Sequence, residues 1–135
     1  MNKISIFRNS ELPRKEANVF LGRVYAMVYG DLLKIGTSKK LKNRVRALKK
    51  QGEYSGIVIG EILFTSPHTN YKENEKQLQI TFSENRIGNT ELFDLNIYDF
   101  IEQVGKLIAV DDSSALFEKS EAVSSHLISV VTNRC

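Results

Sequence analysis

Two apolar, β-prone runs separated by a two-residue turn lie in the first third of the chain. GRVYAMVY covers residues 22–29 and LLKIG covers residues 32–36, with Gly30-Asp31 between them. A Gly-Asp pair in this position is typical of a tight β-hairpin, whose strands are antiparallel neighbours. Because hairpin-connected strands come first, the sequence predicts a layered α+β domain rather than a doubly wound parallel sheet.

Helical and extended patterns alternate after the hairpin. Leu41, Val45 and Leu48 recur at helical spacing, which predicts a helix over residues 39–50 with Ser38 as its N-cap. Gly52 and Gly56 mark the loop that follows this helix. Further helices are predicted over 70–86, 97–107 and 114–131, and further strands over 56–64 and 91–95. The expected fold is a small mixed sheet, made of the hairpin and these further strands, flanked by helices.

A chain of 135 residues suits a single domain with one core. We divide it into an N-terminal arm (1–21), a core (22–95) and a C-terminal helical extension (96–135). The one cysteine, Cys135, excludes an internal disulfide and any cysteine-based zinc site. The chain has neither a signal-peptide pattern nor an apolar run of about eighteen residues, so we expect a cytoplasmic protein that does not contact a membrane.

The charge of the chain is unevenly distributed. Residues 1–50 carry 13 Lys and Arg against 3 Asp and Glu, whereas residues 51–135 carry 6 against 13, which gives net charges of +10 and −7. A basic half favours an anionic partner, nucleic acid first. The candidate contacts are the lysines and arginine before and on the outer side of the first helix: Lys39, Lys40, Lys42, Arg46, Lys49 and Lys50. The alternative is a basic helix face that is simply solvated.

Two charged residues lie at positions where helical geometry predicts an apolar face. Arg44 projects with the apolar residues of the first helix, and Glu75 projects with Tyr71, Leu78 and Phe82 of the second. A charge at such a position needs a partner, since burying an unpaired charge is costly. Glu75 therefore either holds a metal ion or forms a structural ion pair with Arg44, and Arg44 either meets an anion or extends to the rim of the face.

The order and spacing of several residues resemble the GIY-YIG nucleases. Gly22-Arg23-Val24-Tyr25 is similar to the first motif and Lys34-Ile35-Gly36 to the second. Arg44 follows that glycine by eight residues, and Glu75 occupies the place of the helix-borne glutamate. Lys-Ile-Gly as the second motif is similar to a branch common in phages and bacteria, whose members are often described as DNA-binding domains. The resemblance covers residues 22–95.

The resemblance implies a metal-dependent hydrolysis of phosphodiester bonds. Its catalytic residues would be Tyr25, Lys34, Arg44 and Glu75, with Glu75 holding Mg²⁺ or Mn²⁺, and their polar ends would converge on one concave face. The partner would be DNA, bound as a duplex through its phosphates, in the cytoplasm of a cell that a phage infects if the chain is phage-encoded. Lys34 replaces the second tyrosine of the family, Gln79 stands where this branch often has a histidine, and Thr90 replaces a glycine.

These departures leave two alternatives to an endonuclease. One is a nucleic-acid-binding module on the same fold that cleaves weakly or not at all. The other is a phage-encoded protein that modulates a host protein, which the acidic second half of the chain favours.

Overall fold

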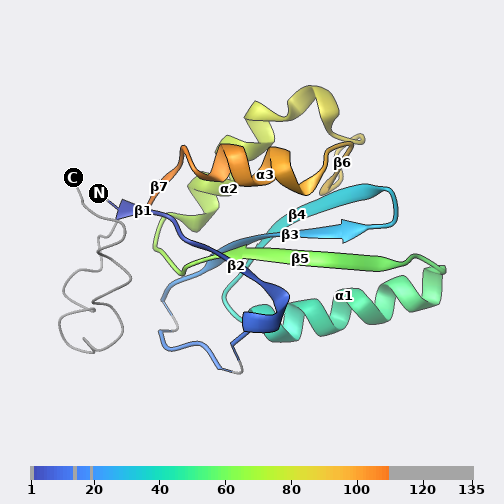
Figure 1. Cartoon of the computed structure of the whole chain (residues 1–135), viewed down its shortest axis with the longest axis horizontal. Helices are drawn as coiled ribbons and strands as arrows, with labels where there is room; N and C mark the ends of the chain where they lie inside the picture. Colours follow the sequence, from blue (N-terminus) through green and yellow to red (C-terminus); the bar gives the residue numbers. More distant parts are fainter. Residues whose placement is uncertain (1, 14, 19, 110–135) are drawn as a thin grey trace.

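A computed structural model describes residues 2–13, 15–18 and 20–109 of the chain. A central sheet is covered on one face by helix α1 and on the other by helices α2 and α3 (Figure 1). The helix predicted over 114–131 and Cys135 lie outside the described residues. None of the described helices is long and apolar enough to cross a membrane.

The central sheet has five strands in the order β2-β5-β3-β4-β6, and the α+β class is confirmed. All of its strand pairs are antiparallel. The predicted hairpin is confirmed as β3–β4, with Tyr25 opposite Gly36. The strands are β2 (Ile6–Arg8), β3 (Arg23–Tyr29), β4 (Leu32–Ser38), β5 (Ile59–Thr65) and β6 (Leu92–Phe93).

The N-terminal segment takes part in strand pairing. Strand β2 pairs with β5 at the edge of the sheet, and β1 (Asn2–Lys3) pairs with β7 (Ile108–Ala109) in a separate two-stranded sheet. Residues assigned from sequence to an arm therefore contribute an edge strand. A short 3₁₀ turn (Asn9–Glu11) follows β2.

Helix α1 (Leu41–Ser55) begins later and ends later than predicted. Ser38 is not its N-cap: Ser38 is the last residue of β4, and its hydroxyl accepts a hydrogen bond from the Lys40 N–H at 3.0 Å. Gly52 lies buried within the helix instead of marking a loop, and a Cβ on it would be 3.0 Å from the Ile59 side chain. Gly56 ends the helix with φ 71°, the left-handed conformation that favours glycine.

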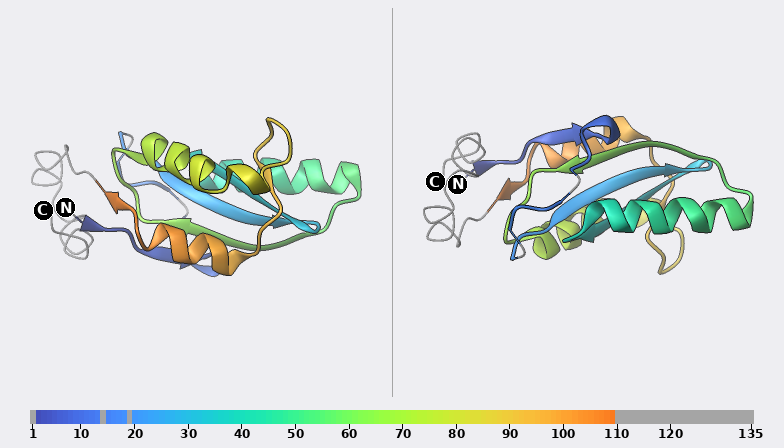
Figure 2. Two further views of the ribbon diagram at one scale, coloured as in Figure 1. Left: turned by 90° about the horizontal axis from the view of Figure 1, so that it is seen from above. Right: turned by 90° about the horizontal axis from the view of Figure 1, so that it is seen from below.

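Helices α2 (Tyr71–Thr81) and α3 (Ile97–Val104) lie side by side over the opposite face, as Figure 2 shows. The helix predicted over 70–86 is shorter, because a 3₁₀ turn (Ser83–Asn85) replaces its last part. Asn96 caps α3: its side chain accepts from the backbone N–H groups of Tyr98 and Asp99.

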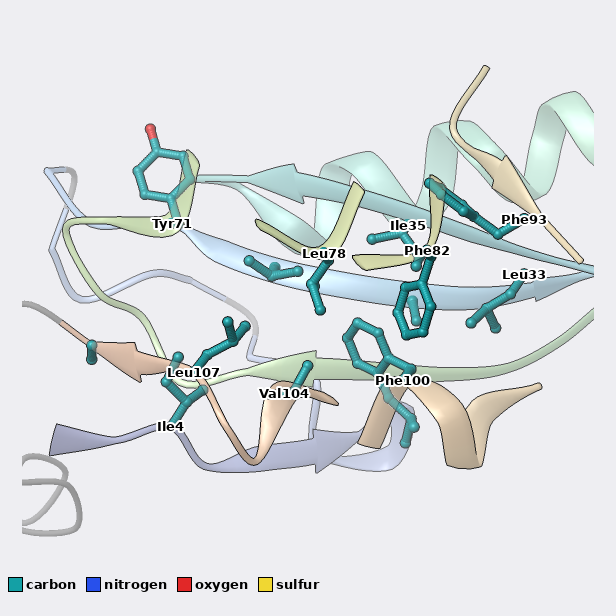
Figure 3. Close-up of a cluster of buried hydrophobic side chains, with 14 residues drawn as sticks. Ile4, Leu33, Ile35, Tyr71, Leu78, Phe82, Phe93, Phe100, Val104 and Leu107 are labelled. Atoms are coloured by element: carbon teal, nitrogen blue, oxygen red, sulfur yellow. The ribbon is translucent and has the colours of Figure 1, made fainter. Parts of the chain in front are cut away.

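Alternation along β3 divides the core between the two faces of the sheet. Val24 and Ala26 point toward α2 and α3, whereas Tyr25, Met27 and Tyr29 point toward α1. The α2–α3 side holds the larger cluster, in which Phe82 and Phe93 meet edge to face (Figure 3). The two cores fix one helix layer to each face of the hairpin.

Candidate active site

Tyr25 is fully buried on the α1 side of β3, and its ring lies across Gly36 of the neighbouring strand. A Cβ built on Gly36 would be 2.6 Å from the Tyr25 hydroxyl oxygen and 2.8 Å from Cζ. Glycine is therefore required at position 36 by close contact, and not by a turn. Gly22 is covered in the same way by the ring of Tyr71, at 2.7 Å. Both motif glycines make room for a tyrosine.

Arg44 reaches the hydroxyl group of Tyr25 from the first turn of α1. Its Nε–H donates to the Tyr25 oxygen at 3.3 Å, and its side chain is 43% exposed. Arg44 thus lies at the rim of the apolar face, which is the alternative that its helical position left open. Burial raises the pKa of Tyr25, although the hydrogen bond from Arg44 opposes the rise. Tyr25 is consequently a neutral phenol at neutral pH.

Glu91 joins this group and was not predicted from the sequence. Its Oε1 lies 3.7 Å from the Arg44 Nη2 and 3.7 Å from the Lys34 Nζ. The Ile35 N–H donates to the Glu91 carbonyl oxygen at 2.9 Å, which fixes Glu91 beside β4. One carboxylate oxygen thus lies between two cations. The sequence offered only one signal, an acidic residue at the start of a short extended segment.

Glu75 approaches the same end of β4 from α2. It is half-buried and lies beside the apolar face, whose buried polar position is taken by Asn74. The pKa of Glu75 is raised, first by burial and then by the negative charge of Glu91, whereas Arg86 and a hydrogen bond from Thr37 act in the opposite direction. Glu75 therefore lies within electrostatic reach of Glu91 and also of Tyr25.

These five residues come from opposite faces of the sheet. Tyr25, Lys34 and Arg44 lie on the α1 side and Glu75 on the α2 side, and they meet around the edge of β4, where pairing with β6 ends at Lys34. The single concave face expected from the sequence stays a prediction. We call the group of Tyr25, Lys34, Arg44, Glu75 and Glu91 the edge site. Within the described residues, Arg44 pairs with Glu91 and forms no ion pair with Glu75.

The predicted DNA-binding residues lie before and along α1. Lys39, Lys40, Arg46, Lys49 and Lys50 are exposed and Lys42 is half-buried. None of them forms an ion pair with another described residue. Their charges are therefore available to an external anion.

The edge site offers two carboxylates as possible ligands for a divalent cation. No group of three or more His, Cys, Asp and Glu side chains that could hold a metal occurs among the described residues. Mg²⁺, however, commonly takes only one or two carboxylates and completes its shell with water and phosphate oxygens. Glu75 and Glu91 provide two carboxylates, and a cation between them would relieve the repulsion that raises the pKa of Glu75.

Fold and site together define a small α+β domain with a Tyr-Lys-Arg-Glu group at a sheet edge beside a basic helix. The profile of the T5orf172 domain matches residues 22–110, which is more than half of the chain. The chain therefore belongs to the T5orf172 domain family, a domain of phage-associated proteins with functions related to nucleic acids. Comparison with curated proteins and with solved structures gave no match.

Replacing Gly36 by alanine is expected to destabilise the fold by roughly 1–3 kcal/mol, because the added Cβ displaces a buried ring in a filled core. Chemical denaturation measures the loss. Gly105→Ala is the matched control, since Gly105 has φ −62° and its Cβ would meet only backbone oxygens at 3.4 and 3.5 Å. In a Tyr25→Phe background, which removes the nearest atom, Gly36→Ala should cost less. Equal costs in both backgrounds would show that Tyr25 does not determine the need for glycine.

Proposed function

We propose that this domain is a metal-dependent DNA endonuclease that works in the manner of GIY-YIG nucleases. One observation carries the proposal: Arg44 holds the Tyr25 hydroxyl and shares the Glu91 carboxylate with Lys34, at the sheet edge that Glu75 approaches from the other face. These are the four residues that the resemblance assigns to catalysis. Membership in a domain family related to nucleic acids supports the same conclusion.

Arg44 and Lys34 would bind the phosphate whose bond is cleaved. Each lies 3.7 Å from the same Glu91 oxygen, so an anionic oxygen can already interact with both cations. A non-bridging phosphate oxygen in that place would keep both interactions, with the planar guanidinium group of Arg44 giving directional hydrogen bonds. The two cations would then stabilise the negative charge that develops during hydrolysis.

Tyr25 would orient the attacking water and would not remove its proton. Because the pKa of Tyr25 is raised, its phenolate form is scarce at neutral pH. Its oxygen accepts a hydrogen bond from Arg44, which leaves the phenol O–H to donate to a water oxygen. This geometry favours positioning by Tyr25 over general-base catalysis.

Glu75 would hold Mg²⁺ or Mn²⁺, with Glu91 as the second carboxylate. When bound, such an ion supplies Lewis-acid polarisation of the phosphate. Because their negative charges repel DNA, the two carboxylates would interact with the phosphate only through the cation. Their place at the edge of β4 would direct the cation toward the phosphate that Arg44 and Lys34 hold.

The proposal is tested with supercoiled plasmid incubated with the full chain and Mg²⁺ or Mn²⁺, beside a control with EDTA. Nicked or linear plasmid that forms only with the metal supports an endonuclease. If plasmid stays intact with either metal while DNA binding is measurable, the enzyme proposal fails.

A domain that binds nucleic acid without cleaving it is the second candidate, and one observation favours it. Glu91 already occupies the space between Arg44 and Lys34, and its charge would have to move away before a phosphate could enter. In a domain that only binds DNA, Glu91 could stay in place and the exposed lysines would make the contacts.

The DNA-binding surface gives a separate prediction. Changing Lys42, Arg46 and Lys49 together to alanine should weaken binding to all sequences alike and reduce the slope of log K against log salt by up to about three, if each contacts one phosphate. Fluorescence anisotropy of labelled duplexes over a salt series measures both effects. A slope that stays unchanged would place the DNA on another surface.

A further inference from the structure

A cavity of about 300 Å³ lies where the N-terminal segment passes the start of α1. We call it the lysine pocket; it is lined by Pro13, Lys15, Glu16, Lys39, Lys40, Lys42 and Asn43. The volume is at the lower end of the range for small-ligand sites and exceeds the space that a single water or ion needs.

The wall formed by the N-terminal segment is fixed by an ion pair. Glu16 lies 3.0 Å from the Arg23 guanidinium group, and the two side chains are 13% and 11% exposed. Arg23 is held in turn by a hydrogen bond from its Nη1 to the Thr65 carbonyl oxygen at 2.9 Å. The N-terminal segment is thereby anchored to the middle of the sheet, which keeps its side of the pocket in place.

The charges that line the lysine pocket are not balanced. Four of its seven residues are lysines, and none of the four forms an ion pair with another described residue. The only carboxylate in the lining, Glu16, is already paired with Arg23. Clefts lined by one sign of charge concentrate oppositely charged ligands. The charge of the lining therefore favours an anionic ligand.

The lysine pocket lies at the same end of α1 as the edge site. Asn43 lines the pocket, and the next residue, Arg44, contacts Tyr25. Successive helix residues project about 100° apart, so the pocket and Arg44 lie on different sides of the first turn of α1, and a nucleic-acid strand that crosses this turn would reach both. Lys15 would give the N-terminal segment, which lies outside the resemblance to the nucleases, a part in binding.

We infer that the lysine pocket is a second phosphate-binding site, which holds another phosphate of the DNA strand that is bound at the edge site. This inference rests on the proposed function, which identifies the bound strand as DNA. The chemistry that it requires is a phosphate or diphosphate group, and a free phosphate compound would satisfy the same lysines. The experiment therefore uses both a free anion and DNA.

Inorganic pyrophosphate is the free probe, and its binding to the full chain is measured by titration calorimetry. The pocket variant is Lys39→Gln with Lys40→Gln. The matched control is Lys76→Gln with Lys106→Gln, which removes the same charge from two exposed lysines outside α1 and outside the predicted DNA-binding residues. We expect the pocket variant to bind pyrophosphate about tenfold or more weakly, since two of the lysines that would contact it are lost, and the control to bind like the parent. Melting temperatures of both variants confirm that each is folded.

Competition then identifies the source of the phosphate. Pyrophosphate should displace a labelled DNA duplex from the parent chain, and the pocket variant should lose about two units of the salt dependence of DNA binding. Pyrophosphate that binds without displacing DNA would overturn the assignment to the strand. Absent binding, or equal weakening in both variants, would overturn the pocket itself. Neither result depends on cleavage, so a failure of the nuclease proposal would be seen separately, as intact plasmid.

Discussion

Replacing Glu75 by glutamine is expected to reduce metal-dependent plasmid nicking at least about a hundred-fold, the scale of losing one preorganised electrostatic group. The side chain keeps its size and loses only the charge that would hold the metal. Affinity for DNA should hold or rise, because a negative charge near the phosphates is gone. Nicking rates and duplex affinities, measured on the same protein, separate these two effects.

The stability of this variant should not fall. The pKa of Glu75 is raised by burial and by the charge of Glu91, so folding disfavours its charged form, and a charge at this position lowers the stability. Glutamine removes that cost. A structural Glu75–Arg44 ion pair would predict a loss of roughly 3–5 kcal/mol if buried, but Arg44 pairs with Glu91 instead.

Glu73→Gln is the matched control, since Glu73 is exposed on the same helix and loses the same charge. It should nick DNA like the parent. Nicking by Glu75→Gln at the parental rate would remove Glu75 from catalysis. A steep drop in its melting temperature, with no cleavage by the parent, would instead identify Glu75 as a structural residue.

Local patterns in the sequence were enough to predict the hairpin and the existence of its neighbouring helices. The β3–β4 hairpin follows from two apolar runs and a Gly-Asp turn, which are all contained in 15 consecutive residues, Gly22 to Gly36. Helix ends were less accurate, because end positions depend on tertiary contacts. Gly52 is read as a helix breaker from sequence, but the packing of Ile59 against it keeps it inside α1.

Long-range pairing explains what the sequence did not predict. Strand β2 has only three residues, and its place in the sheet comes from pairing with β5, more than fifty residues later. Glu91 reaches the edge site because β6 pairs with β4, and no periodicity in the segment indicates that register. Helical geometry did bring Arg44 near the sheet, but the 100° spacing could not decide between a buried position and the rim.

The candidate site was also predicted only in part: the sequence indicated four of its residues but not how they are arranged. Helical position singled out Arg44 and Glu75, and the resemblance to GIY-YIG nucleases added Tyr25 and Lys34. The structure joins Tyr25, Lys34 and Arg44 through contacts that include Glu91, and Glu75 approaches from the other face. Their arrangement around the edge depends on which face each element covers. The face that each element covers is decided by the packing of the whole domain, because the two cores form from residues that are far apart in sequence.

Acid is expected to destabilise the protein through His68, which the sequence did not single out. His68 is 3% exposed, and its Nδ1 lies 2.8 Å from the Ser66 carbonyl oxygen, so Nδ1 carries the proton. The other ring nitrogen, Nε2, is buried without a hydrogen-bond partner in the described chain. Burial lowers the pKa of His68 to about 4.

The unfolded chain binds a proton at His68 with a pKa of about 6.5, well above the folded value. Protonation therefore favours unfolding, and stability declines as the pH falls below about 6.5, until the folded form is also protonated near pH 4. Between about pH 7.5 and pH 4, this one group should lower the free energy of unfolding by about 3 kcal/mol. Urea denaturation at a series of pH values measures the decline.

Carboxylates also titrate in this range, so the contribution of His68 is the difference between two curves. His68→Asn keeps a side-chain N–H near the position of Nδ1 and cannot take up a proton. The variant starts from a lower stability, because the smaller side chain leaves a cavity, and the readout is the slope of stability against pH. Its curve should be flatter than that of the parent by about 3 kcal/mol over the window. Parallel curves would mean that His68 is already charged in the folded protein, or that it reaches solvent, and would refute its burial as a neutral imidazole.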